Sequence, residues 1–183
     1  YDTLTEANVG GGTGTFGSST GTSSTSYSND DFYGSLYTSP ADAGGATISS
    51  ITARCASASF GGNSRNVKAL IVRHSDLTIL GVSSPTIVST TANDYTFTFS
   101  TPVTIAASTD YIIGLISDGS FYFYYSSGST NQGHVDTSNS YTTPTNPTDA
   151  THNTNAYRLT VTYNKPNNYQ LDQEVQFSGV SAA

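Results

Sequence analysis

The chain of 183 residues contains no methionine, no tryptophan and a single cysteine, Cys55. One cysteine excludes an internal disulfide, so the fold must depend on its hydrophobic core. Cys55 continues an alternating apolar run with Ile51 and Ala53, which predicts a buried, unreactive thiol. Because methionine is missing even at position 1, we expect a secreted protein whose signal peptide has been removed.

Charged residues are also scarce. They make up 10% of the chain, against roughly a quarter in an average soluble domain. Six cations in a chain of net charge -7 cannot neutralise a run of phosphates, which excludes charge-driven binding of nucleic acid. The longest unbroken apolar run is residues 121–125, far shorter than the roughly 20 residues of a membrane-spanning helix. We therefore expect no membrane-spanning segment.

Short runs with a two-residue hydrophobic period begin after residue 31. In residues 95–99, Tyr95, Phe97 and Phe99 alternate with threonines, which predicts a half-buried strand. Residues 66–73 are apolar on both faces, which predicts a central strand that is covered on both sides. No segment has the periodicity of an amphipathic helix, so the chain is predicted to be all-β.

Two apolar runs, 110–117 and 121–125, are separated by the turn sequence Asp118-Gly119. This spacing predicts a hairpin. Short strands separated by turns, with apolar residues divided between two faces, favour an antiparallel β-sandwich of the jelly-roll kind. A closed barrel is the main alternative.

The composition divides the chain into three parts. Residues 1–31 form an N-terminal segment in which the Gly/Ser/Thr-rich stretch 10–28 is predicted to be a linker or surface loop. Residues 32–163 form the sandwich domain. Residues 164–183 contain an Asn/Pro spacer followed by a C-terminal strand or tail.

Three stretches resemble a known kind of module: NVKALIV (66–72), YTFTFSTPVTIAASTDYIIGLISDG (95–119), and the segment that includes TNQGHVDTSNSY and THNTNAYRLTVTY (130–163). They are similar to a jelly-roll-like module of secreted and cell-surface proteins of archaea and bacteria, including choice-of-anchor proteins. The resemblance implies an extracellular, modular and non-catalytic role, and it brings no catalytic residues. The tail 169–177 resembles the segment that follows this module in such arrays.

This tail has one apolar and one polar face, and a lone strand of that kind cannot bury its apolar side unaided. It either closes its own sandwich or completes the sheet of a neighbouring subunit. The N-terminal segment is the weaker candidate for donation, because Leu4, Ala7 and Val9 do not share one face of a strand. Repeated head to tail, the second arrangement grows a filament. We therefore predict a homopolymeric structural protein of an extracellular filament, pilus or surface layer, in which the donated strand is held by Leu171, Val175 and Phe177.

The alternative function is that of a carbohydrate-binding module of a longer secreted protein. Tyr122 and Tyr124 alternate with apolar residues and would form an outer platform able to stack on surface glycans, with Tyr37 and Tyr141 as extensions. Burial by cross-strand packing or a subunit contact is the other interpretation. A viral or phage fibre domain is a third possibility that composition does not separate from the first.

Metal-binding patterns are weak, and we expect no cofactor. Two imidazoles and a carboxylate lie in one polar region of the sequence and could bind a divalent transition metal: His134, Asp136 and His152. The other interpretation is that the carboxylate builds a turn and the histidines face solvent. A second candidate metal site consists of the side-chain oxygens of Asn29, Asp30 and Asp31, which could bind a structural Ca²⁺.

Overall fold

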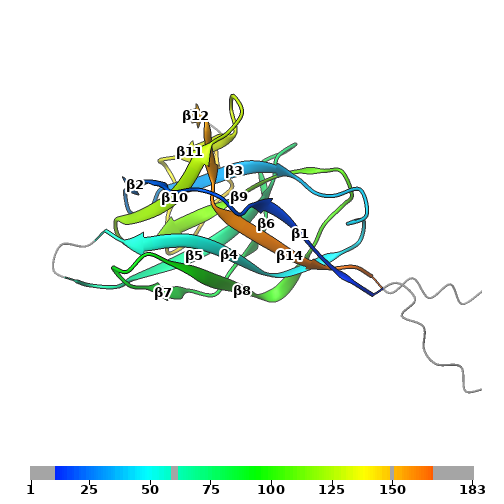
Figure 1. Ribbon diagram of the computed structural model, residues 1–183, viewed down its shortest axis with the longest axis horizontal. Helices are drawn as coiled ribbons and strands as arrows, with labels where there is room; N and C mark the ends of the chain where they lie inside the picture. Colours follow the sequence, from blue (N-terminus) through cyan, green and yellow to red (C-terminus); the bar gives the residue numbers. More distant parts are fainter. Residues whose placement is uncertain (1–10, 59–61, 149–150, 167–183) are drawn as a thin grey trace, which may run out of the picture.

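The computed structural model describes residues 11–58, 62–148 and 151–166 (Figure 1). These residues form two antiparallel β-sheets that pack face to face around a shared core. The all-β antiparallel sandwich predicted from the sequence is confirmed. The described residues include no helix long and apolar enough to cross a membrane.

The first sheet, sheet A, contains seven strands: β1 (Thr13–Ser18), β2 (Ser23–Tyr27), β4 (Thr47–Ser57), β8 (Asn93–Thr104), β10 (Phe121–Ser127), β13 (Asn155–Tyr157) and β14 (Leu159–Asn164). Strand β4 pairs with β8 on one side, and with β14 and then β10 on the other. Strands β1 and β2 pair with β14 and β10 and form the outer edge of the sheet.

The second sheet, sheet B, also contains seven strands: β3 (Phe32–Thr38), β5 (Arg65–Arg73), β6 (Thr78–Val82), β7 (Thr86–Val88), β9 (Asp110–Ser117), β11 (Gly133–Asp136) and β12 (Thr151–Asn153). Their order is β12-β11-β3-β9-β5-β6, with β7 beside β5. The chain crosses from one sheet to the other at most connections, which is typical of jelly-roll-like sandwiches.

The predicted hairpin between 110–117 and 121–125 is wrong. Strand β9 pairs with β3 and β5 in sheet B, whereas β10 lies in sheet A. The turn at Asp118 therefore carries the chain across the sandwich, and its carboxylate accepts hydrogen bonds from the Asn66 backbone N–H and side chain (3.0 and 2.7 Å). The inward residues of both strands, such as Ile113 and Phe121, enter the same core from opposite sheets.

The expectation that residues 10–28 form a linker or loop is also wrong, because they contain β1 and β2. An edge strand requires mainly backbone hydrogen bonds, and glycine, serine and threonine supply these as other residues do. Two aromatic side chains of this stretch, Phe16 and Tyr27, pack against the core. The sandwich thus begins well before residue 32.

Strand β5 is central and covered on both faces, as predicted. Its inward residues join the main core, whereas Leu70 and Val72 belong to a second cluster on the outer face of sheet B. The connection between β11 and β12 covers that cluster: Tyr141 packs against it, and its carbonyl oxygen accepts a hydrogen bond from the Lys68 Nζ (2.8 Å). The outer face of sheet B is therefore covered at this cluster, whereas no described residue covers the outer face of sheet A.

The thiol of Cys55 is fully buried in the main core, in agreement with the sequence. Burial raises the pKa of this thiol well above its usual range, and the nearby Asp94 carboxylate adds to the effect. We expect no reaction of the native protein with a disulfide reagent at pH 8, and complete labelling in denaturing guanidinium. Rapid stoichiometric labelling of the native protein would contradict this placement.

Candidate functional site

The open outer face of sheet A carries two rows of hydroxyl groups. Directly opposite residues on antiparallel strands have side chains on the same face, and the register of β8, β4, β14 and β1 aligns seven hydroxyl residues in this way. The hydroxyl rows consist of Thr96, Thr52 and Thr160 in the first row, and Thr98, Ser50, Thr162 and Thr15 in the second.

The rows face outward because the intervening residues of each strand, such as Ile51, Phe97 and Val161, are buried in the core. Neighbouring hydroxyls across the sheet are spaced by about 4.8 Å, and those along a strand by about 6.8 Å. One pair, Thr52 and Thr96, lies within hydrogen-bond distance at 3.4 Å. This part of the face is regular, polar and uncharged.

A charged row lies next to the hydroxyl rows. The Arg54 backbone N–H donates to the carbonyl oxygen of Arg158 (3.1 Å), and the Arg158 N–H donates to that of Tyr124 (2.8 Å). On the other side of β4, Arg54 is directly opposite Asp94 of β8. The charged row thus consists of four side chains from separate parts of the chain: Asp94, Arg54, Arg158 and Tyr124.

The side chains of this row interact with one another. Asp94 Oδ1 lies 3.6 Å from Arg54 Nη1, and Asp94 Oδ2 lies 3.1 Å from Arg158 Nη2. The Arg54 guanidinium also lies over the Tyr124 ring, 5.4 Å from its centroid, which is a cation–π geometry. Both arginine side chains are 29% exposed, so they remain accessible to a ligand.

A shallow pocket of about 210 Å³ opens beside the charged row. Its lining is mostly polar: Ser19, Thr52, Arg54, Asp94, Arg158, Leu159 and Thr160. It is smaller than the roughly 300–1,000 Å³ of a site for a drug-sized ligand. A pocket of this size suits one small polar group, such as a carboxylate or a single sugar ring.

The two tyrosines proposed from the sequence as a platform lie on this face. The residue Tyr122 is 39% exposed, and Tyr124 is half-buried beneath Arg54. The expected extensions are wrong. Tyr37 faces the inside of the sandwich, where its hydroxyl donates to the carbonyl oxygen of Tyr157 (2.5 Å), and Tyr141 packs on the outer face of sheet B.

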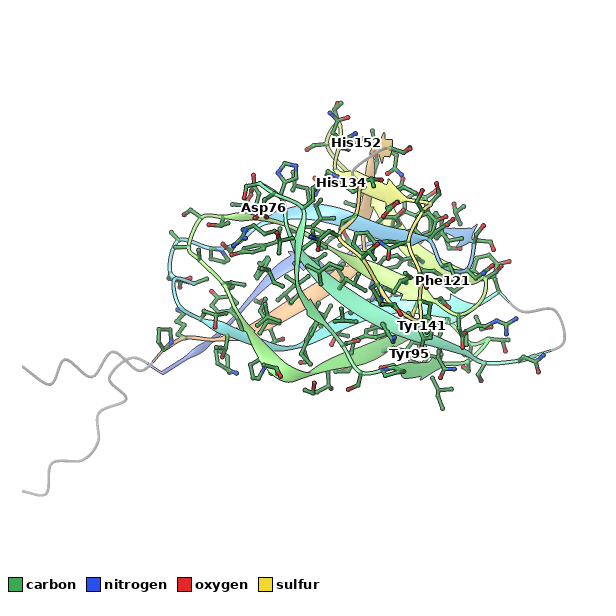
Figure 2. All side chains as sticks on the ribbon, turned by 180° about the vertical axis from the view of Figure 1, so that it is seen from behind. Asp76, Tyr95, Phe121, His134, Tyr141 and His152 are labelled. Atoms are coloured by element: carbon green, nitrogen blue, oxygen red, sulfur yellow. The ribbon has the colours of Figure 1, made fainter. Side chains whose placement is uncertain are left out.

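The structure brings the candidate metal ligands only partly together. The rings of His134 and His152 are 4.6 Å apart, and His74 adds a third ring 5.5 Å from His134 (Figure 2 shows the first two side by side). Asp136 instead builds a turn, since its carboxylate accepts hydrogen bonds from the Ser138 N–H and from the side chain of Asn139 (3.0 and 2.9 Å). No three His, Cys, Asp or Glu side chains are arranged to hold a metal ion in the described part of the chain.

The oxygen donors considered for Ca²⁺ connect loops to strands. Asp30 accepts hydrogen bonds from the Asn29 side chain (2.9 Å) and from the Tyr141 backbone N–H (2.8 Å). Asp31 accepts one from the Tyr33 hydroxyl (2.7 Å). The carboxylates of Asp30 and Asp31 therefore have a structural role, because they accept hydrogen bonds that hold neighbouring segments together. The apolar tail residues Leu171, Val175 and Phe177 lie outside the described residues.

Sequence reasoning missed Arg54, Asp94 and Arg158, because no local pattern relates them. The hydroxyl rows have a local signal, since β8 and β14 each contain a Thr-x-Thr motif and β4 contains Ser50-Ile-Thr52. Only the register of the strands turns these motifs into rows. In the described residues, the fold is a β-sandwich in which sheet B has an apolar cluster covered by Tyr141 and sheet A has a polar, exposed outer face. In comparisons with known proteins, no protein family matches the chain and no curated protein is significantly similar to it.

Proposed function

We propose that the chain is a non-catalytic structural protein of the cell exterior. It serves as a secreted subunit of a filament, pilus or surface layer, and it assembles with copies of itself by β-strand complementation. The observation that carries this proposal is the edge of sheet A formed by β1 and β2. The resemblance of residues 66–72, 95–119 and 130–163 to exterior jelly-roll-like modules supports the same role.

No strand of the described residues pairs with the outer side of the edge formed by β1 and β2. Natural sheet edges are usually shielded by charged residues, proline or a covering segment, because their free backbone groups pair readily with another strand. Residues 13–27 contain no charged residue and no proline. Within the described ranges, β1 pairs only with β14 and β2 only with β10, so both leave one side of the strand available.

The other described edges have fewer strand residues than β1 and β2 together, or they are covered. Strand β8 carries Asp94 and Pro102, and the Ser84 N–H donates to the Thr98 carbonyl oxygen (2.9 Å) on its outer side. In sheet B, the outer strands β6, β7 and β12 have between three and five residues. The β1–β2 edge is therefore the best suited to accept a further strand.

The donated strand would be supplied by residues 169–177 of another copy. Figure 1 shows β1 and β14 side by side, and the Lys165 N–H donates to the Gly12 carbonyl oxygen (2.8 Å). Asp42 anchors this end of the sandwich by accepting hydrogen bonds from Tyr163 (2.9 Å) and Lys165 (2.6 Å). The chain thus continues toward the tail from a fixed point beside β1, which supports a head-to-tail arrangement of arm and edge.

We expect polar substitutions on the apolar side of the tail to abolish assembly. The triple variant Leu171→Asp, Val175→Asp, Phe177→Asp should remain a folded monomer, because a strand with acidic or polar side chains on both faces cannot be buried in a neighbour. The double variant Thr15→Lys, Ser24→Lys should have the same effect by placing charge on the acceptor edge. Size-exclusion chromatography and negative-stain electron microscopy measure both effects.

Each variant has a matched control. Asp172→Ser with Gln176→Ser changes the opposite face of the tail, and Ser100→Lys with Thr130→Lys adds two charges at exposed positions outside the edge. Both controls should assemble as the unmodified chain does. A triple tail variant that still formed the native assembly would show that residues 169–177 are not the donated strand.

A further inference from the structure

The outer face of sheet A has a charge that is unusual for this protein. The chain has a net charge of -7 and only six cations. Two of these, Arg54 and Arg158, share the single carboxylate of Asp94, so the charged row has a formal charge of +1. By contrast, Arg73 and Lys165 each pair with a carboxylate of their own, Asp76 and Asp42.

Within the described residues, the guanidinium groups of Arg54 and Arg158 have more N–H donors than their contacts with Asp94 use. Each guanidinium carries five N–H donors in a planar fork that matches a carboxylate. Arg54 and Arg158 each approach Asp94 through one terminal nitrogen. Both side chains also line the 210 Å³ pocket, together with the hydroxyls of Thr52 and Thr160. The pocket therefore offers charged donors for an anion beside hydroxyls that can donate to or accept from a polar ring.

The tyrosines extend this site along the sheet. Tyr124 lies at the end of the charged row beneath Arg54, and Tyr122 is two residues further along β10 on the same face. An exposed aromatic ring stacks on the apolar face of a sugar and has a hydroxyl for its polar edge. The hydroxyl rows continue the polar surface on the other side. An elongated ligand that carries both anionic and hydroxyl groups would contact the arginines of the pocket, the two tyrosines and the hydroxyl rows.

We propose that the outer face of sheet A binds an anionic saccharide, specifically a uronate-bearing glycan. The uronate carboxylate occupies the pocket between Arg54 and Arg158, and a neighbouring sugar ring stacks on Tyr122. A nucleic acid does not fit this face, because one net positive charge cannot neutralise a run of phosphates. This binding function is separate from assembly, since the β1–β2 edge pairs through backbone groups and the site uses outward side chains.

The test is isothermal titration calorimetry of the full chain with two polymers, polygalacturonate and a neutral β-glucan. We expect binding of polygalacturonate that weakens with added salt, and at least about tenfold weaker binding of the neutral polymer. The double variant Arg54→Gln, Arg158→Gln should lose at least about tenfold in affinity, because charge-assisted hydrogen bonds to the carboxylate are removed. Tyr122→Ala should weaken binding by a few-fold through loss of stacking.

The variant Asp94→Asn is expected to change the affinity in the opposite direction. Removal of the competing carboxylate leaves both guanidiniums free for the ligand, so the affinity for polygalacturonate should rise several-fold. A purely structural role of the ion pairs predicts a loss of binding in this variant as well. Arg73→Gln, which breaks an exposed ion pair elsewhere, is the matched control and should bind unchanged.

Three outcomes would overturn the proposal: no binding of polygalacturonate by the unmodified chain, equal binding of the neutral polymer, or unchanged affinity in the double arginine variant. Thermal unfolding of each variant checks that the sandwich is intact. Because the titration can be done on the tail variant that does not assemble, failure of this proposal and failure of the proposed assembly are distinguishable.

Discussion

Replacement of Gly114 by alanine is expected to lower the free energy of unfolding by at least about 3 kcal/mol, at the upper end of overpacking effects. Gly114 lies in the middle of β9 and is directly opposite Gly34 of β3. A Cβ atom at this position would lie 2.0 Å from the carbonyl oxygen of Tyr33 and 2.4 Å from the Cα of Gly34. Both are backbone atoms of a paired strand, so relief of the clash requires the two strands to separate.

Gly44→Ala is the matched control. A Cβ atom there would meet the Ala107 Cβ at 3.5 Å, an ordinary van der Waals contact. Its stability should stay within about 0.5 kcal/mol of the unmodified chain. Guanidinium denaturation followed by circular dichroism compares the two variants, and equal stability of both would contradict the close approach of β3 and β9.

The second large effect is expected for Phe123→Ala, which should destabilise the fold by about 3–5 kcal/mol. The Phe123 ring is fully buried and stacks on Tyr157, with centroids 4.3 Å apart and ring planes inclined by 10°. Truncation removes this contact and leaves a cavity in the centre of the main core. The neighbouring strands cannot close over it, because β10 is paired with β2 on one side and with β4 and β13 on the other.

The adjacent residue supplies the comparison. Tyr122 faces solvent, so Tyr122→Ala should cost less than about 1 kcal/mol. The same denaturation measurement gives both values. Similar losses in the two variants would mean that the assignment of the β10 residues to the inside and outside of the sandwich is incorrect. A small loss of stability also matters for the saccharide titration, because the Tyr122→Ala variant must be folded for its affinity to be compared.

The two proposals assign different parts of sheet A to different tasks. The proposed assembly would use backbone groups along the β1–β2 edge, whereas the proposed saccharide site consists of outward side chains such as Arg54 and Arg158. Neither proposal uses sheet B, where Tyr141 packs on the apolar cluster of the outer face. A subunit with this division could be joined to its neighbours and still present a binding face along the resulting polymer.

The inside and outside of individual strands were predictable because side chains alternate with a period of two residues, a property of the local sequence. Phe97 and Phe99 are buried with threonines outside, β5 is covered on both faces, and the Cys55 thiol is buried, all as their alternation predicts. The outward placement of Tyr122 follows from the same rule. The low-complexity stretch 10–28 has no such alternation, so β1 and β2 could not be recognised.

What the sequence by itself determined is therefore the all-β class and the face on which most core residues lie. Only the tertiary structure decided which strands are neighbours: β9 and β10 lie in different sheets, and β1 and β2 form an edge of sheet A. It also decided that Asp94, Arg54, Arg158 and Tyr124 form one row, although they come from separate parts of the chain. The physical reason is that strand order and register depend on how two sheets bury their apolar faces together, and no local period encodes that choice.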